Sequence, residues 1–205
     1  MNALPPLQKG ALVAVAADRT RRSIAFQYNP ETLRRTLEPN TVGGQPGSRS
    51  RAIRFAGAPT ETITLDCRFS AVDAIDGGSD PNGIAPQLAA LAVLLYPSVE
   101  AVTAAQTMLD AGSIEVIPAL ADELLFVFGD ARVVPVQLMS ATIVEELYDS
   151  DLVPVLATVT LTLRALTYSD VSAPNPAASD FLSYQTRLTT LADGAFSTGG
   201  PGGAA

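Results

Sequence analysis

The sequence contains no histidine and no tryptophan, and cysteine occurs once, as Cys67. The lack of histidine removes the most common general base, the most common nitrogen ligand for metals and every serine–histidine or cysteine–histidine nucleophile. A single cysteine cannot form an intramolecular disulfide. Carboxylates remain, but Glu145 and Glu146 point to opposite faces if they lie in a strand, so they cannot converge on one substrate bond. We therefore predict a protein that is not an enzyme and that holds no cofactor.

Long apolar runs are also missing. The longest, residues 88–96, is about half of the ~18 residues that a membrane-spanning helix needs, and Pro97 ends it. The first residues lack the charged and then apolar layout of a signal peptide. The acidic loop 76–83 has Gly78 where the calcium-binding EF-hand pattern needs Asp or Asn. We expect a chain that starts in the cytoplasm, does not insert into a membrane and binds no metal.

Apolar residues, in contrast, are abundant for a chain of this size. The 205 residues have room for one good-sized domain with tails, and 47% of them are hydrophobic. This share exceeds what a small monomer needs for its core. We expect part of the excess to face partner subunits.

Basic residues are few, and most of them lie near the start of the chain. The net charge is −8, yet the first 54 residues carry nine basic and three acidic side chains. The remaining residues carry four basic and eighteen acidic ones. Two interpretations stay open: a basic arm that docks on an acidic surface of a neighbouring copy, or a solvated arm without a partner. Nucleic-acid binding is not expected, because the acidic bulk of the chain repels phosphates.

The most informative motif runs from Phe26 to Pro30, with the sequence Phe-Gln-Tyr-Asn-Pro. Ile24, Phe26 and Tyr28 alternate with polar or small residues, which predicts a strand with one apolar face. Proline cannot donate to a ladder and pushes Asn29 towards extended geometry, so the strand must end there. The motif contains no catalytic arrangement and predicts a structural role.

Alternation elsewhere predicts a mainly β chain of the α+β class. Expected strands cover residues 10–17, 23–29, 32–37, 62–69, 114–118, 124–128, 132–146 and 155–168. Cys67 falls on the apolar face of its strand, so we expect a buried, unreactive thiol. Pro135 predicts a bulge or an edge within 132–137. The 3.6-residue period predicts helices over 86–96 and, after the N-cap Ser98, over 99–109, with a third over 179–193.

The order of several short motifs resembles the contractile injection system tube-protein family, whose members build phage-tail-like particles. These motifs are Lys9-Gly-Ala-Leu-Val13, Phe26 to Pro30, Pro59-Thr-Glu-Thr-Ile63, Gly83 to Leu91 with Tyr96-Pro97, Arg132-Val-Val-Pro-Val136, Glu145 to Asp149, and Val159-Thr-Leu-Thr-Leu163. The resemblance covers about residues 4–170. It points to the baseplate tube-initiator or adaptor subtype. Many members of that subtype end in a LysM domain, which the short glycine-rich end of this chain does not resemble.

The resemblance implies a tail-tube-like antiparallel β-barrel or sandwich with a short helical insertion and extended loops. We therefore expect a tail-tube-like β domain over residues 1–170. Within it, residues 39–54 would be a mobile Arg-rich loop and residues 85–111 the helical insertion. Residues 171–205 would form a C-terminal extension that is partly helical and then glycine-rich and flexible.

The resemblance also implies a structural role and self-association. Six copies would close a ring that links the spike or hub protein of the particle to the polymerising tube protein. The candidate inter-subunit contacts are Arg34, Arg35, Arg49, Arg51 and Arg54, with Glu145, Glu146, Asp149 and Asp151 as acidic partners. Phe26, Tyr28, Asn29 and Pro30 are expected to be structural residues of the family motif.

Two other functions stay open at the level of sequence. The chain could be a bulk inner-tube subunit of the same particle, although its long loops and C-terminal extension favour the adaptor. It could also be a monomeric ligand-binding β-sandwich, which would expose aromatic side chains on one face of a sheet.

Overall fold

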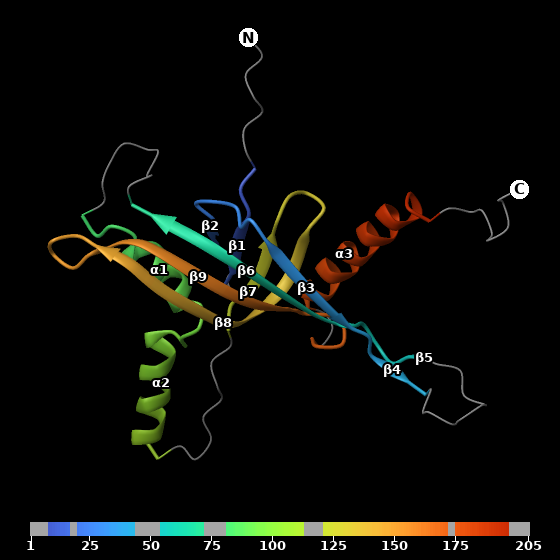
Figure 1. Ribbon diagram of the computed structural model, residues 1–205. Helices are drawn as coiled ribbons and strands as arrows, with labels where there is room; N and C mark the ends of the chain where they lie inside the picture. Colours follow the sequence, from blue (N-terminus) through green and yellow to red (C-terminus); the bar gives the residue numbers. More distant parts are fainter. Residues whose placement is uncertain are drawn as a thin grey trace, which may run out of the picture.

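The computed structural model describes residues 8–16, 20–43, 54–71, 81–112, 121–171 and 175–196. Its strands are β1 (Ala11–Val15), β2 (Arg21–Ala25), β3 (Leu33–Glu38), β4 (Thr41–Val42), β5 (Arg54–Phe55), β6 (Thr60–Ser70), β7 (Glu123–Val127), β8 (Val133–Tyr148) and β9 (Pro154–Ala165). Its helices are α1 (Ala85–Val93), α2 (Val99–Asp110) and α3 (Pro176–Asp193) (Figure 1). None of these three helices has the length and hydropathy needed to cross a bilayer.

Seven strands form one antiparallel sheet, in the order β2-β1-β7-β8-β9-β6-β3, and β4 pairs with β5 in a small ribbon. The predicted mainly β, α+β fold with a helical insertion is confirmed. The closed barrel is not formed among the described strands, because β2 and β3 are the two edges of an open sheet.

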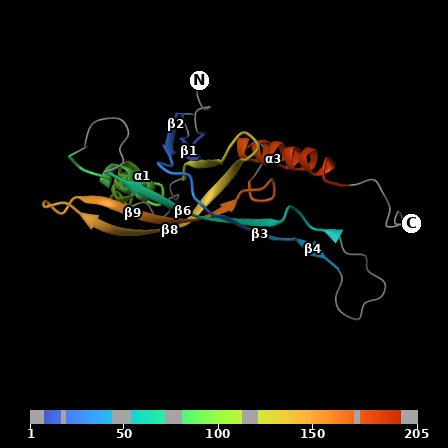
Figure 2. The same ribbon diagram turned by 45° about the horizontal axis from the view of Figure 1, so that its top comes forward.

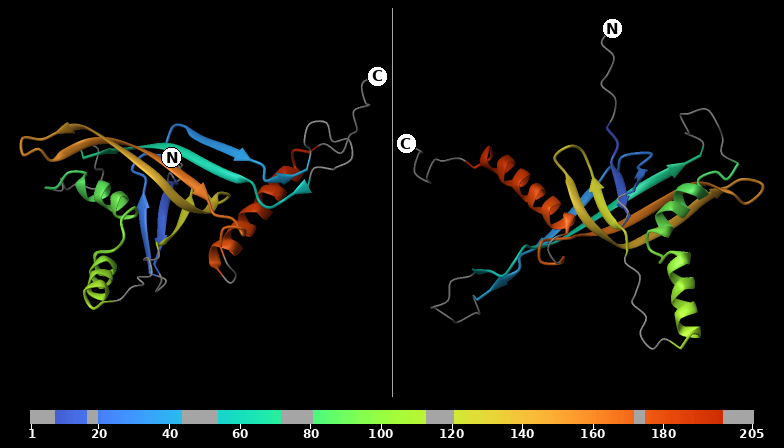
Figure 3. Two further views of the ribbon diagram at one scale, coloured as in Figure 1. Left: turned by 90° about the horizontal axis from the view of Figure 1, so that it is seen from below. Right: turned by 180° about the vertical axis from the view of Figure 1, so that it is seen from behind.

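The long strand β8 joins two parts of this sheet. Its beginning pairs with β7, whereas its residues from Val136 to Tyr148 pair with β9. The register shifts between Leu138 and Ser140, where an extra residue bends the strand. In the left view of Figure 3, the dark blue strands β1 and β2 run across the long orange strand β9. The bend therefore gives the open sheet two walls that face one another.

Pro135 lies within β8 and not at an edge of the sheet. It pairs with Leu125 of β7, and its carbonyl accepts a hydrogen bond of 2.8 Å from the Leu166 N–H. The nitrogen and the carbonyl of one strand residue point to the same side, so the missing N–H faces the side where β9 has already ended. Leu166 still lies opposite on that side, so proline leaves this pair with one backbone bond in place of two, and the bulge lies at Leu138–Ser140.

The core fills the space inside the bend. Phe26 and Phe126 have ring centroids 6.4 Å apart, and Phe128 stacks on Phe126 at 5.9 Å. The helices α1 and α3 add buried side chains to the same core: Leu88, Leu91, Phe181 and Tyr184. Each such side chain contributes about 1.5–3 kcal/mol when it leaves water. The part of the C-terminal extension that the structure describes is thus packed on the sheet.

The N-cap residues of α2 and α3 determine where these two helices begin. Ser98 is the N-cap of α2 and accepts a hydrogen bond from the Ala101 N–H, as predicted. Asn175 caps α3 in the same way, with Pro176 in the first turn, so this helix begins three residues earlier than the apolar period indicated.

Some predictions fall partly or wholly outside the described residues. These are the strand 114–118, most of the acidic loop 76–83, most of the loop 39–54, residues 172–174 of the C-terminal extension and both chain ends. The predicted strand 23–29 is shorter, because β2 ends at Ala25 and the next residues make other bonds.

Candidate assembly surfaces

Gln27 connects two parts of the open sheet through its side chain. Its Nε2 donates to the Ser70 carbonyl at 2.7 Å, and its Oε1 accepts from the Ser70 N–H at 2.8 Å. The carboxamide thus makes the two bonds that a paired strand residue would make. Ser70 ends β6, and Gln27 follows the edge strand β2, so this contact ties the two walls together without a ladder. Tyr28 and Pro30 line an open groove at the surface beside it.

Asn29 holds the segment that precedes β1. Its Oδ1 accepts from the Gly10 N–H at 2.8 Å, and its Nδ2 donates to the Gln8 carbonyl at 2.9 Å. The Phe26 N–H donates to the Gly10 carbonyl at 2.8 Å, and its ring is fully buried. A Cβ atom at Gly10 would lie 2.7 Å from the Phe128 ring, so the backbone approaches as closely as glycine allows. The motif Phe26 to Pro30 therefore acts inside the subunit.

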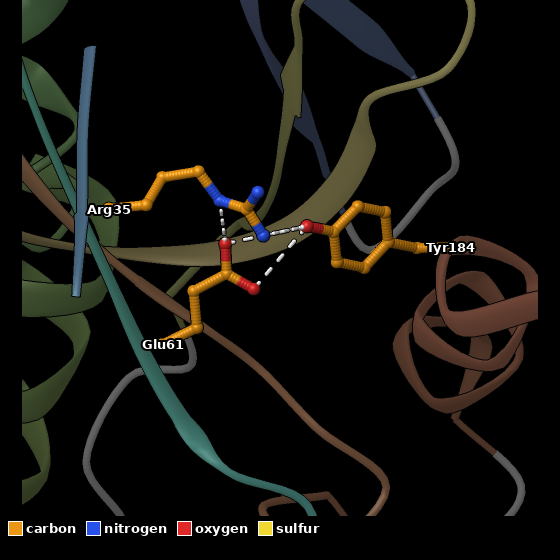
Figure 4. A network of polar contacts seen from close by, with 3 residues as sticks. All are labelled: Arg35, Glu61 and Tyr184. Atoms are coloured by element: carbon orange, nitrogen blue, oxygen red, sulfur yellow. Dashed lines mark hydrogen bonds and ion pairs between the residues drawn. The ribbon is translucent and has the colours of Figure 1, made fainter. Parts of the chain in front are cut away.

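Arg35 lies in a buried polar network and not on a free surface (Figure 4). Its Nε donates to Glu61 Oε1 at 2.6 Å, and its Nη2 donates to the Tyr184 hydroxyl at 2.6 Å. The Tyr184 hydroxyl also lies 3.4 Å from both Glu61 oxygens. Glu61 is 2% exposed, so its charge depends on this arginine. The network joins β3, β6 and α3.

The ionisation of these groups follows from their surroundings. The hydrogen bond to Glu61 raises the pKa of Arg35 against the opposing effect of burial. Burial raises the pKa of Tyr184, and the negative charge of Glu61 raises it further. Arg35 therefore stays protonated and the phenol stays neutral at ordinary pH.

Glu61 was not predicted as a site residue, although the alternation of its strand indicates a buried position. Glu61 is in phase with Ile63, Leu65 and Cys67, which all point into the core. A carboxylate on the apolar face of a strand requires a buried partner. The neighbouring residue Arg34 points to the other face and is exposed, so the two adjacent arginines differ completely in environment.

Cys67 is buried, and burial raises the pKa of its thiol to about 12. A thiol with this pKa carries almost no thiolate at neutral pH and is a poor nucleophile. In the described part of the chain, no group of three or more His, Cys, Asp and Glu side chains is arranged to hold a metal ion.

The ribbon β4–β5 projects from the ends of β3 and β6, and we call residues 39–58 the arm (Figures 1 and 2). Thr41 lies opposite Phe55 and Val42 lies opposite Arg54, so Phe55 and Arg54 occupy different faces of the ribbon. The Phe55 side chain is 83% exposed. Of the candidate arginines, Arg54 is exposed here, whereas Arg49 and Arg51 lie outside the described residues.

The end of β8 and the turn that leads to β9, residues 144–153, form a second projection that we call the tip. Asp149 Oδ1 accepts hydrogen bonds of 2.9 Å from the N–H groups of Asp151 and Val153, which fixes the turn. Glu146 accepts from the Thr158 hydroxyl at 2.8 Å. A hydrogen bond to Glu145 raises the pKa of Tyr148. All four predicted acidic residues are exposed, and exposed apolar side chains accompany them: Val144, Leu147, Tyr148 and Leu152.

Leu152 in the tip has φ of 61°, a left-handed conformation that costs a branched side chain roughly 1–2 kcal/mol. Its side chain is 79% exposed, so no internal packing offsets this cost. We expect Leu152→Gly to raise the free energy of unfolding by about 0.5–1 kcal/mol, measured by urea denaturation. Leu147→Gly, in extended strand geometry, should lower it by about 0.5–1 kcal/mol. Equal losses in both variants would contradict a strained turn.

The arm and the tip lie at opposite ends of the molecule, in every view of the chain (Figures 1, 2 and 3). The arm sequence carries three arginines and no acidic residue, although the exposed Glu38 directly precedes it, whereas the tip carries carboxylates and no basic residue. One subunit therefore presents opposite charges at its two ends.

No protein-family model and no curated protein sequence matches the chain. Among solved structures, the chain has a weak likeness to a chain from the virion of a native gene transfer agent particle. The two share 11% identity with a TM-score of 0.30, over 76% of this chain and 90% of that chain.

Proposed function

We propose that this protein is a structural ring component of a phage-tail-like contractile injection particle, in the position of an adaptor between the spike and the inner tube. The family motifs in the sequence suggest the particle. The observation that carries the proposal is the pair of oppositely charged projections at opposite ends of one sheet.

Because the two ends of one subunit carry opposite charges, they favour head-to-tail contacts between identical subunits. Such contacts close into a ring when the rotation per subunit divides a full turn, and six copies are the number that the family resemblance implies. The edge strands β2 and β3 keep free backbone groups on one side, which neighbours in a ring can cover. The exposed apolar side chains of arm and tip would then be buried on assembly.

An adaptor and a bulk tube subunit differ in what they assemble into. A bulk subunit stacks ring on ring without a limit, whereas an adaptor forms one ring that contacts different proteins above and below. We favour the adaptor because α3 and the arm extend the subunit well beyond its sheet, which leaves more surface for unlike partners (Figure 1).

The mass of the purified full chain in solution tests this proposal. We expect light scattering across protein concentration to detect a species near six times 21.3 kDa that does not elongate. Long tubes would support the bulk subunit instead. A chain that stays monomeric at every concentration, and that also fails to bind the tube and spike proteins of its particle, would contradict both assignments.

A further inference from the structure

The turn between α1 and α2 borders an apolar groove of about 750 Å³, with the beginnings of β2 and β7 on its other side. Its apolar wall is formed by Leu95, Tyr96 and Val99, and the last two side chains are 73% and 76% exposed. The ion pair between Arg22 and Asp122, at 2.6 Å, lies at the opposite wall. This volume is typical of sites that enclose a side chain or a small ligand.

The helix α2, which forms one end of the groove, lacks support from the rest of the subunit. None of its twelve residues is buried. Isolated helices of this length are marginal in water, and α2 exposes Val102 and Leu109 on the same side as Val99. A helix with an apolar side and no buried residue is typical of an element completed by a partner.

The arm carries an exposed aromatic side chain and positive charge, which suit the apolar wall and the acidic residue of the groove. Phe55 is a large, exposed aromatic side chain in the projecting ribbon, and such residues are enriched in the buried centre of interfaces. Residues 81–112, which include α1 and α2, carry Glu100 and Asp110 and no Lys or Arg. The arm sequence carries Arg49, Arg51 and Arg54 and no acidic residue. The groove is also lined by Arg22, but this residue is paired with Asp122, so Glu100 leaves the groove with a negative charge that suits the arm.

The positions of the arm and the groove also favour an arm from a second copy of the chain as the group that fills the groove. The arm and the α1–α2 turn lie at opposite ends of the subunit, so the arm does not reach the groove of its own chain (Figures 1 and 3). The tip at the same end as the groove is a poorer seat for the arm, because Asp149 and Glu146 already accept hydrogen bonds within the hairpin.

We propose that the arm of one copy docks on the α1–α2 turn of the next copy, with Phe55 inserted in the groove. The proposal rests on the proposed function, since it assumes that copies of this chain meet head to tail. It names the contact that sets the order of subunits, and it explains why α2 has an apolar side although none of its residues is buried.

Engineered cysteines test the contact directly. Thr41 lies opposite Phe55 in the arm and Ala101 lines the groove, so Thr41→Cys and Ala101→Cys mark the two sides. The native Cys67 is buried with a raised pKa and does not compete for the reagent. When the two single variants of the full chain are mixed, a short bifunctional maleimide should yield a dimer linked between positions 41 and 101. Either variant alone should not yield that dimer.

The side chain of Phe55 provides the second measurement. Phe55→Asp should weaken self-association at least about thirtyfold and abolish the 41–101 cross-link, as expected for an interface anchor. Phe196→Asp makes the same change at a side chain that is 76% exposed at the end of α3, and it should change association less than about threefold.

The outcomes separate this inference from the function on which it rests. Oligomers that form without the 41–101 cross-link would overturn the arm contact and leave the ring component intact. Equal effects of Phe55→Asp and Phe196→Asp would also overturn it. A chain that associates neither with itself nor with the tube and spike proteins would refute the proposed function, and the inference with it.

Discussion

Arg35→Ala is expected to lower the free energy of unfolding by about 3 kcal/mol, because it leaves the Glu61 carboxylate buried without its counter-charge. The range for such changes is about 3–5 kcal/mol, and we expect its lower end because the Arg35 side chain keeps 24% of its surface in solvent. The Tyr184 hydroxyl loses its 2.6 Å donor at the same time. Urea denaturation measures the change, with an unchanged dependence on urea as a check that unfolding stays two-state.

Two control variants test whether the loss of stability comes from the ion pair between Arg35 and Glu61. Arg34→Ala, on the neighbouring exposed residue, should cost less than about 0.5 kcal/mol. The double variant Arg35→Met with Glu61→Leu removes both charges and should recover most of the loss, since a buried ion pair and an apolar pair differ little in stability. If Arg35→Ala costs no more than Arg34→Ala, then the ion pair with Glu61 does not stabilise the fold.

The network also bears on assembly. The arm extends from β3 and β6, and Arg35 and Glu61 lie on these same two strands, next to the point where the arm begins. Tyr184 connects both residues to α3. We therefore infer that α3 supports the base of the arm, and that a loss of this support would loosen the arm before it unfolds the sheet.

Reversal of the arm charge should have the largest effect on assembly. We expect Arg49→Glu, Arg51→Glu and Arg54→Glu together to raise the dissociation constant of the oligomer at least about 100-fold, because like charges placed across an interface cost several kcal/mol. Association of the unmodified chain should weaken as salt is raised, since the Debye length falls to about 3 Å at 1 M. Light scattering on the triple variant, at low and high salt, measures both effects.

A matched triple variant keeps the positive charge. Lysine at positions 49, 51 and 54 should retain association within about fivefold, unless the arginines make paired hydrogen bonds that lysine does not reproduce. Particles that assemble normally with the three glutamates would show that the arm has no part in the ring. A solvated arm, the other interpretation of the basic N-terminal region, would then be correct.

Secondary structure and burial could be predicted from the sequence wherever the residues that determine them lie within one short segment. Alternation around Cys67 placed the thiol inside, and its burial is confirmed. Ser98 correctly predicted the start of α2, because an N-cap side chain bonds to the first turn of the helix that it begins. The third helix was found with its beginning displaced, since Asn175 and Pro176 determine the start and the apolar period does not include them. The roles proposed for the exposed charges of arm and tip stay predictions.

The sequence by itself determined the periodicity of the strands, the class of the fold, the position of Cys67 and the unequal distribution of charge along the chain. The tertiary structure decided which of two adjacent arginines is buried, because Arg35 meets a helix 149 positions later in the sequence. It also decided that Gln27 leaves its strand to bond Ser70, and that arm and groove lie at opposite ends. Local patterns record which face of an element is apolar, whereas the partner of that face depends on how distant segments pack.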